Sequence, residues 1–289
     1  MGMIPHLTPD IIDDIPVYFS AGDFVENALP KNVPIPVGVG MGQRWVFMGP
    51  GTDFFNFDEG PTAKGIKIYA RNGSLKFVTP EDYSLLVESV RPQGIISLYS
   101  SILPNTSNRQ KKIRTEMATQ FSTKYENTIN FTSHISQNDE NALFVQCGEL
   151  TEEIEDEITS AISRRPENLP RMILMDGYPS DLRKAISLGF DLLIPRLPFV
   201  FAERGFAMTF SFDGKSESKS ICIDLKSPEY EHDHSPISED CDCQCCQHHT
   251  KSYLYHLLEV HEMLIGTLLV QHNIRHYQRF VQAIAEEEV

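Results

Sequence analysis

Four of the six cysteines in this chain lie within six residues, and this cluster is the part of the sequence best suited to chemistry. Cys243 and Cys246 are separated by two residues, the spacing of a common zinc knuckle, and Cys241 is close enough to reach the same ion. Cys245 directly precedes Cys246, and adjacent residues rarely both reach one small ion. The spacing therefore predicts three thiolate ligands, Cys241, Cys243 and Cys246.

His272 is the preferred fourth ligand. It follows Cys246 by 26 residues, on the face of a predicted helix that also carries the apolar Ile265, Leu268 and Leu269. An apolar face packs inward, so the imidazole is expected to point toward the thiols rather than toward water. Three residues nearer the cluster stay open as rivals for this position: Cys245, His248 and His249.

The predicted ligand set indicates a structural role for the metal. Three cysteines and one histidine fill the tetrahedral shell of Zn²⁺, whereas a catalytic zinc keeps one position open for water. Binding of zinc at comparable peptide sites supplies ~10–16 kcal/mol at neutral pH. We therefore expect one structural zinc that holds together elements too small to fold alone.

The elements upstream of the cysteines alternate short apolar strands with helices, the pattern of parallel strands joined by crossover helices. The predicted strands span residues 94–100, 142–147, 171–177 and 191–195. The predicted helices span residues 109–121, 151–164 and 179–188, and Thr151 is suited to cap the second of them. The sequence therefore predicts an α/β fold, with a barrel as the preferred form.

The two ends of the chain follow other patterns. Near the N-terminus, residues 33–42 and 48–65 are rich in glycine and proline and are predicted to be loops, followed by a hairpin of strands 66–70 and 75–78. A helix capped by Thr79 is predicted to run to about Val90. Toward the C-terminus, a β-ribbon of residues 205–212 and 219–225 precedes the cysteines, and one long helical pattern follows them. We expect residues 1–212 to form the barrel core and residues 213–289 to form the zinc-binding subdomain with its helix.

The net charge of −15 opposes an independent grip on nucleic acid, because phosphate contacts need Lys and Arg. No apolar run reaches the ~18 residues of a membrane span, and no N-terminal stretch has the basic start and apolar run of a signal peptide. We therefore expect a cytoplasmic protein in which clustered thiols bind metal rather than form disulfides.

Two stretches of the sequence carry a family resemblance. The stretch "CDCQCCQHHTKSYLYHLLEVHEMLIGTLLVQHN" resembles the zinc subdomain of the tRNA-guanine transglycosylases, whose ligands would fall on Cys241, Cys243, Cys246 and His272. The stretch "GFDLLIPRLPFVFAERGFAMTFSF" is similar to the accessory, non-catalytic branch of that family. The resemblance implies a (β/α)8 barrel with an inserted zinc subdomain, and a role in exchanging guanine for queuine at the wobble position of tRNA.

The same resemblance implies that this chain lacks a catalytic nucleophile. Catalytic members of the family attack the ribose with an aspartate three residues after the Asp of a "G-x-D" stretch, and here "GFDLLIP" places Ile194 at that position. Asp191 is the nearer carboxylate, but strand alternation sends positions 191 and 194 to opposite faces, so Asp191 is interpreted as structural. A second catalytic aspartate, in a "DSGGF" stretch, and a Gly-rich base-recognition stretch have no counterparts here. No catalytic residue is therefore predicted.

The chain also departs from the family pattern in length. Relative to that pattern, about one strand–helix unit is missing between the helix at 151–164 and the strand at 171. A barrel that lacks a unit must close with fewer strands or stay open, which would expose strand edges. The predicted barrel is therefore incomplete.

The resemblance and the residues together favour a non-catalytic subunit. It would form a heterodimer with a catalytic queuine tRNA-ribosyltransferase and contact tRNA through that complex, in the cytoplasm or peripherally at the mitochondrial outer membrane. One alternative is a zinc-stabilised interaction module without an RNA role. A weaker alternative is an active base-exchange enzyme that uses Asp176 or Asp191.

Overall fold

The computed structural model describes residues 16–25, 44–51, 64–70, 73–99, 107, 109, 112–113, 115–117, 125, 128–134, 140–212 and 221–287. The described residues divide into two compact units: unit 1 ends at Ile194 and unit 2 begins at Pro195. The predicted loop at 33–42 and most of the predicted helix at 109–121 lie outside the described residues. The domain boundary expected after Phe212 stays a prediction, since the compact units divide earlier, within the last strand of the sheet.

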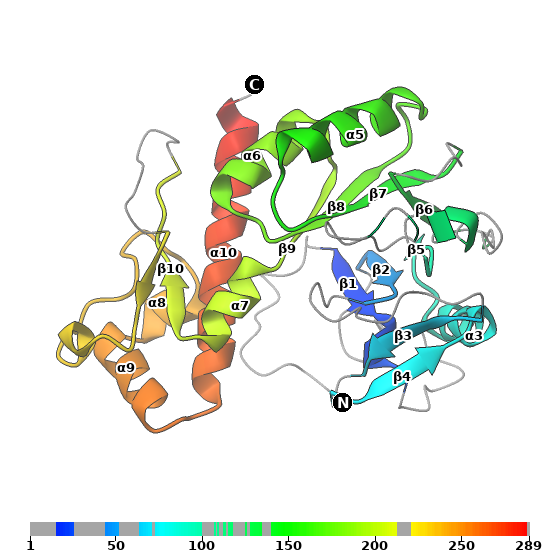
Figure 1. Ribbon diagram of the computed structural model, residues 1–289. Coiled ribbons are helices and arrows are strands. Elements are labelled where there is room, and N and C mark those ends of the chain that lie inside the picture. Colours follow the sequence, from blue (N-terminus) through cyan, green and yellow to red (C-terminus); the bar gives the residue numbers. More distant parts are fainter. Residues whose placement is uncertain are drawn as a thin grey trace. The chain divides into compact units, whose positions relative to one another are not determined.

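Unit 1 is built on a seven-stranded sheet in the order β1-β2-β5-β6-β7-β8-β9 (Figure 1). Neighbours from β1 through β8 pair in parallel, as expected for strands joined by crossovers. The strands are β1 (Val17–Ser20), β2 (Val46–Gly49), β5 (Gly94–Ile96), β6 (Ile129–Ser133), β7 (Ala142–Gln146), β8 (Arg171–Met175) and β9 (Leu192–Pro195). The described part of the chain thus has one strand fewer than an eight-stranded barrel, which confirms the predicted incomplete TIM-like barrel.

Side chains on one face of this sheet form the interior of the barrel. Along β2, Phe47 points to this interior, whereas Val46 and Met48 belong to a second cluster on the other face, because successive side chains of a strand alternate. The interior is filled by hydrocarbon rather than left as a pore, as in other parallel barrels. Its buried members are Phe47, Ile96, Phe131, Ala142, Phe144, Met172 and Leu174, with Tyr18, Ile129, Leu192 and Ile194 packed against them.

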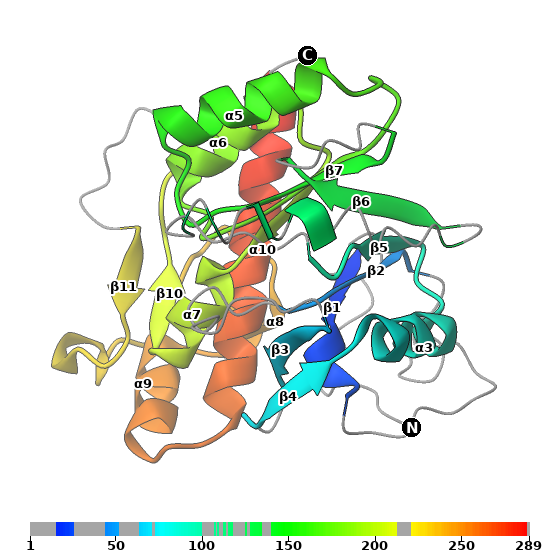
Figure 2. The same cartoon turned by 45° about the vertical axis from the view of Figure 1, so that its right-hand side comes forward.

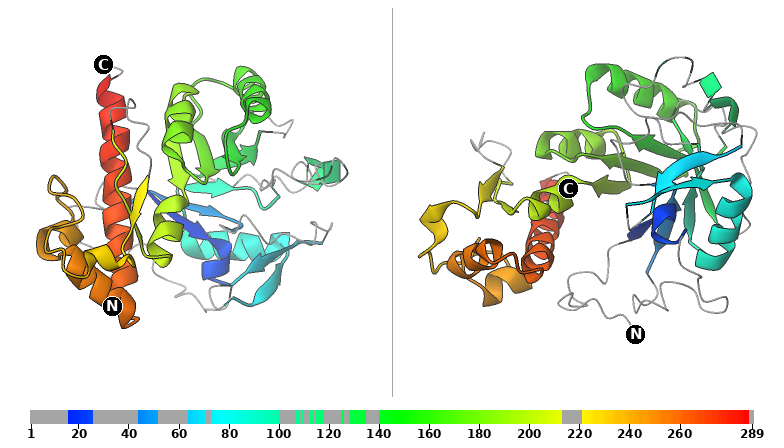
Figure 3. Two further views of the ribbon diagram at one scale, coloured as in Figure 1. Left: turned by 60° about the vertical axis from the view of Figure 1, so that its left-hand side comes forward. Right: turned by 60° about the horizontal axis from the view of Figure 1, so that its bottom comes forward.

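The predicted hairpin and its following helix are confirmed. Strands β3 (Ile66–Tyr69) and β4 (Leu75–Val78) pair antiparallel, and α3 (Pro80–Val90) begins after Thr79. The Thr79 hydroxyl accepts from the Asp82 N–H at 3.1 Å, and the Asp82 carboxylate accepts from the Thr79 N–H at 3.1 Å, which satisfies two backbone donors that a bare helix start leaves unpaired. Apolar side chains of the hairpin and of α3 share one core cluster with β2 and β5, and Figure 3 shows the two elements lying together.

The crossover helices of the second half match the prediction closely. Helix α5 (Glu152–Ser163) connects β7 to β8, and α6 (Pro179–Ser187) connects β8 to β9. Thr151 caps α5 as expected, and the two helices lie side by side in Figures 1 and 2. Because β7 and β8 are direct neighbours joined by α5, the chain runs from one strand to the next without a gap, and the shortened barrel forms a continuous sheet here.

Three strands of the sheet were not predicted. The loop predicted for residues 48–65 is wrong at its start, because β2 continues to Gly49. Strands β1 and β6 have no predicted counterpart either. Each of these strands has only four or five residues, and the polar residues within β6 interrupt its apolar pattern. Their pairing with neighbours, rather than their local sequence, makes them strands.

The described residues of unit 2 form a short ribbon and four helices. The ribbon pairs β10 (Phe206–Met208) with β11 (Cys222–Asp224) in antiparallel register, and η2 (Pro228–Tyr230) is a short 3-10 turn. The helices are α7 (Leu197–Glu203), α8 (Gln244–His248), α9 (Lys251–Glu259) and α10 (Leu264–Glu287). Figure 1 shows α7 and β10 alongside α10, and the four buried cysteines of the cluster belong to the core of this unit.

The prediction of one long C-terminal helix is wrong. Helix α9 ends at Glu259, and α10 begins only at Leu264. Between them His261 has a φ of 55°, and the Glu262 N–H donates to the Leu257 carbonyl at 2.9 Å, which closes the first helix with a left-handed residue. Among the described residues, no helix is both long enough and apolar enough to cross a membrane.

Candidate metal centre

The structure brings together Cys241, Cys243, Cys246 and His272. Their donor atoms all lie within 4.8 Å of one another, and all four residues are buried. From the His272 Nδ1, the Sγ atoms lie at 3.8 Å (Cys241), 3.7 Å (Cys243) and 3.2 Å (Cys246). Four soft or borderline donors therefore converge on one point in the core of unit 2.

Backbone geometry at the start of α8 fixes two of the thiols. Cys243 is the N-cap of α8, and its Sγ accepts from the Cys246 N–H at 3.4 Å. The thiol thus takes the place that a hydroxyl or carboxylate usually holds at a helix start. The Gln247 side-chain amide donates to the Cys241 carbonyl at 2.9 Å. The turn from Cys241 to Gln247 is therefore held in shape by its own contacts.

An ion pair ties the cysteine turn to α10. The Arg275 guanidinium donates to both carboxylate oxygens of Asp242, at 2.7 Å and 2.5 Å, the two-bond geometry that makes Arg–carboxylate pairs strong. Arg275 holds the pKa of Asp242 below its ordinary value. Asp242 lies between two of the cysteines, and Arg275 lies about one helical turn after His272. This pair therefore places the thiols beside the histidine, and the sequence analysis did not identify it.

The imidazole of His272 is oriented by a backbone carbonyl. Its Nε2 lies 2.9 Å from the Met208 oxygen. A carbonyl can only accept, so Nε2 must carry a hydrogen, and Nδ1 is the nitrogen that faces the three thiols. Metal-binding histidines commonly use one nitrogen for the metal and donate the other N–H to a carbonyl or carboxylate.

Close packing of the donors shifts their pKa values. Hydrogen bonds with Cys243 and Cys246 lower the pKa of the Cys241 thiol, whereas hydrogen bonds with Cys241 and Cys243 raise the pKa of Cys246. Burial lowers the pKa of His272, but hydrogen bonds with Cys241 and Cys243 outweigh it and raise the value to about 9. The ionisation of each donor therefore depends on its neighbours in the cluster.

The donor set fits zinc. With Zn–S bonds of about 2.3 Å and Zn–N bonds of about 2.0–2.1 Å, a tetrahedral site separates its ligand atoms by about 3.5–3.8 Å. The Nδ1 distances to Cys241 (3.8 Å) and Cys243 (3.7 Å) fall in that range, whereas the distance to Cys246 (3.2 Å) is shorter. Nδ1 is the nitrogen that faces the thiols. These four residues could hold one metal ion, and all four positions of a tetrahedral shell would be occupied by protein.

The rivals for the fourth position lie elsewhere. Cys245 is fully buried in the apolar core of unit 2, where burial raises the pKa of its thiol. The His249 ring stacks on Tyr253 with ring centroids 5.0 Å apart, and His248 is exposed at the end of α8. None of the three belongs to the donor cluster found among the described residues.

Comparison with known proteins points to the same region of the chain. A sequence profile described as "Queuine tRNA-ribosyltransferase" matches residues 141–287, just over half of the chain, which includes both the donor cluster and the second half of the barrel. The chain belongs to the queuine tRNA-ribosyltransferase family.

Members of this family from vertebrates and bacteria are similar to the chain. "Queuine tRNA-ribosyltransferase accessory subunit 2" of Homo sapiens is 32% identical over 161 residues, which cover 45% of this chain and 39% of the relative. "Queuine tRNA-ribosyltransferase" of Acinetobacter baylyi is 26% identical over 246 residues, which cover 74% of this chain and 60% of the relative. The chain thus spans less than two thirds of the length of these relatives.

The two candidate carboxylates, Asp176 and Asp191, flank the strands β8 and β9. Asp191 accepts from the Arg171 N–H at 2.8 Å, and its own N–H donates to the Arg171 carbonyl at 3.0 Å, which links the starts of β8 and β9. Asp176 follows β8, and its N–H donates to the Gly148 carbonyl at 3.0 Å. Ile194 packs against the barrel interior together with Leu192, so position 191 lies on the other face of β9, as the alternation predicted.

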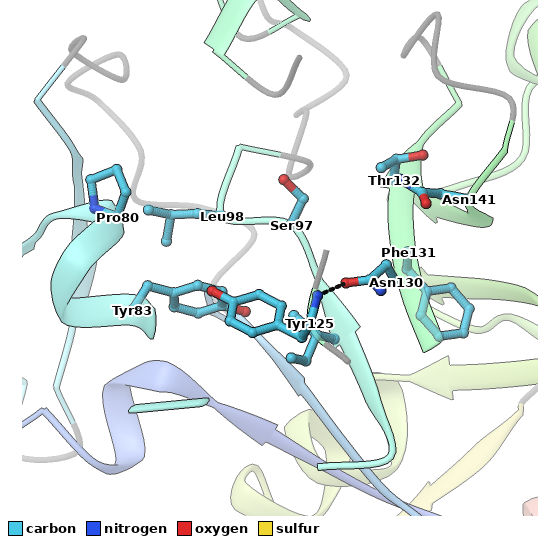
Figure 4. Close-up of a pocket in the computed structure, with 10 residues that line it drawn as sticks. Pro80, Tyr83, Ser97, Leu98, Tyr125, Asn130, Phe131, Thr132 and Asn141 are labelled. Atoms are coloured by element: carbon cyan, nitrogen blue, oxygen red, sulfur yellow. Dashed lines mark hydrogen bonds between the residues drawn. The ribbon is translucent and has the colours of Figure 1, made fainter. Parts of the chain in front are cut away.

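A small cavity in unit 1 lies beside α3 and the strands β5 and β6. Its volume is about 30 Å³, and Figure 4 shows polar side chains around it, including Tyr83, Ser97, Tyr125 and Thr132. One water needs roughly 10–15 Å³ by the same kind of measure, so the cavity has room for a few waters. The described residues that line it include no carboxylate.

Proposed function

We propose that this chain is a non-catalytic subunit that supports exchange of guanine for queuine in tRNA. The observation that carries the proposal is the side chain of Ile194, which packs into the barrel interior. In catalytic relatives an attacking aspartate is expected at this position, and a hydrocarbon cannot attack a ribose carbon. The similarity to an accessory subunit supports the same role.

We propose that the partner is a catalytic queuine tRNA-ribosyltransferase and that tRNA is bound by the complex. A net charge of −15 disfavours binding of tRNA by this chain alone. The partner would then supply most of the Lys and Arg contacts to phosphate. We expect this complex to form in the cytoplasm.

We propose that the bound metal is zinc and that it is structural. The three sulfurs, the Nδ1 of His272 and the Met208 carbonyl behind it support this assignment. When bound, zinc would hold the cysteine turn and α10 together and would offer no open position for water. The residues of this chain supply the orientation: Arg275 holds the turn, and Met208 holds the imidazole.

Incorporation of labelled queuine into tRNA tests the proposed role. The chain alone is expected to give no incorporation, and addition of the chain to a catalytic queuine tRNA-ribosyltransferase is expected to raise incorporation above that of the catalytic protein alone. Incorporation by the pure chain that disappears in Asp176→Asn or Asp191→Asn would overturn the proposal. A chain that neither raises incorporation nor co-purifies with the catalytic protein would favour an interaction module without an RNA role.

A further inference from the structure

Side chains of α10 bond to the edge of strand β10 that does not pair with β11. On the other edge, the backbone of this segment bonds to β11 and the residues that flank it. The Leu225 N–H donates to the Gly205 carbonyl, and the Thr209 N–H donates to the Ile221 carbonyl. The alternate residues Phe206, Met208 and Phe210 face α10 instead. The α10 side chains that bond to them are His272, Asn273 and His276.

Asn273 makes the largest share of these contacts. Its Oδ1 accepts from the Met208 N–H at 2.8 Å, and its Nδ2 donates to the carbonyls of Phe206 and Pro198, both at 3.1 Å. The side chain is 0% exposed. It therefore ties α10 to both β10 and α7 through hydrogen bonds that no water can replace without opening the core.

Both backbone groups of Met208 are used by neighbouring residues of one helix. Asn273 takes the Met208 N–H, and His272 Nε2 donates to the Met208 carbonyl at 2.9 Å. The orientation of this backbone segment decides where its carbonyl points. The carbonyl in turn decides which nitrogen of His272 carries the hydrogen and which one faces the thiols.

We propose that Asn273 is a positioning residue for the metal centre, acting through the Met208 backbone on the tautomer and orientation of the His272 ring. This inference rests on the proposed zinc site, which it extends beyond the four ligands. Asn273 bonds to the strand and to α7, not to the donor atoms, so its effect on the metal is indirect. Loss of an outer-shell partner of this kind typically weakens metal binding by about 10–100-fold.

The test compares Asn273→Leu with the control His276→Phe. Leucine at 273 has a similar size and loses all three hydrogen bonds. His276 is a matched control because its Nε2 bonds to the Phe210 carbonyl at 3.0 Å, which attaches the same helix to the chain just after β10 without contacting Met208. The His276 ring also stacks on the His272 ring, with centroids 6.0 Å apart, and phenylalanine keeps an aromatic ring there while it loses the hydrogen bond. Both variants are expected to unfold at lower temperature than the wild type.

Three readouts on the full chain separate positioning from general destabilisation. These are Zn²⁺ affinity by chelator competition, the visible spectrum of the Co²⁺-substituted protein, and the histidine tautomer by ¹⁵N NMR. Asn273→Leu is expected to lower Zn²⁺ affinity by about 10–100-fold, shift the Co²⁺ bands and lose the Nε2–H signature of His272. His276→Phe is expected to leave the three readouts near those of the wild type.

The outcomes distinguish this inference from the zinc proposal beneath it. A wild-type chain that binds neither Zn²⁺ nor Co²⁺ would contradict the metal centre itself. A wild type that binds metal, with an Asn273→Leu variant of unchanged affinity and spectrum, would overturn only the positioning role. Should the leucine variant fail to fold, Asn273→Ala is measured in the same way, since it removes the three hydrogen bonds without adding a larger apolar side chain. Unchanged metal binding in that variant would also count against the inference.

Discussion

At the scale of single residues, the donor cluster depends on contacts that the ligands make with other groups. The Sγ of Cys243 is held by a backbone N–H, and the Nε2 of His272 by the Met208 carbonyl. The ligand types and their spacing could be predicted from sequence because they lie within one turn and on one helix face. The partners Met208, Arg275 and Asn273 could not be predicted, because only folding brings them to the site.

Replacement of Cys246 and Cys245 by alanine tests which thiols bind the metal. Cys246→Ala removes one of four donors. Loss of an outer-shell partner weakens metal binding by up to about 100-fold, and loss of a ligand itself is expected to lower Zn²⁺ affinity by more than that. Cys245→Ala removes a neighbouring thiol that is equally part of the apolar core but lies outside the donor cluster.

Zinc titration of the two purified variants measures the difference. Cys245→Ala is expected to bind one equivalent with nearly the affinity of the wild type, although loss of its buried sulfur lowers stability. Equal loss of zinc in both variants would mean that the cluster uses Cys245 as a ligand.

At the scale of elements, the predictable parts of the fold are those with strong local signals. Helix α3 has a reciprocal cap between Thr79 and Asp82, and α5 has the Thr151 cap. The strands β1 and β6 lack such signals and form by pairing with neighbours. The break between α9 and α10 was missed because apolar residues keep their helical spacing across it, while the left-handed His261 interrupts the backbone.

One contact between elements has a predictable pH dependence. Asp233 accepts from the Ser235 N–H and hydroxyl and from Lys251 at the start of α9, and these bonds lower the pKa of Asp233. The ionised side chain therefore stabilises the fold at pH values above the ordinary Asp pKa of about 3.9, and this stabilisation is lost as pH falls through the lowered pKa.

Asp233→Asn is expected to lower the melting temperature at pH 7 by about 2–4 °C, with a difference from the wild type that narrows below pH 4. Thermal unfolding followed by circular dichroism at several pH values measures this. Glu231→Gln is the control, since it removes the same charge from an exposed neighbouring position. A Glu231→Gln variant that loses as much stability as Asp233→Asn would contradict a specific role for the Asp233 bonds.

At the scale of the whole molecule, the family match and the donor cluster fall in the same part of the chain. The match covers residues 141–287 and so includes β7 through α10. The α/β class of the fold could be predicted from alternating strands and helices. The order of the seven strands in the sheet could not be predicted, because it depends on pairing between short segments far apart in sequence. The acidic net charge belongs to this scale as well, since it disfavours binding of nucleic acid by this chain alone.

The central claim is that three thiolates and one imidazole close around a single zinc ion in the core of unit 2. Native mass spectrometry of the full chain, purified without chelators, tests it most directly. The account predicts one zinc ion per chain in the folded charge states, and its loss in His272→Ala. A folded wild-type chain that carries no metal, or a His272→Ala chain that keeps its full equivalent of zinc, would contradict it.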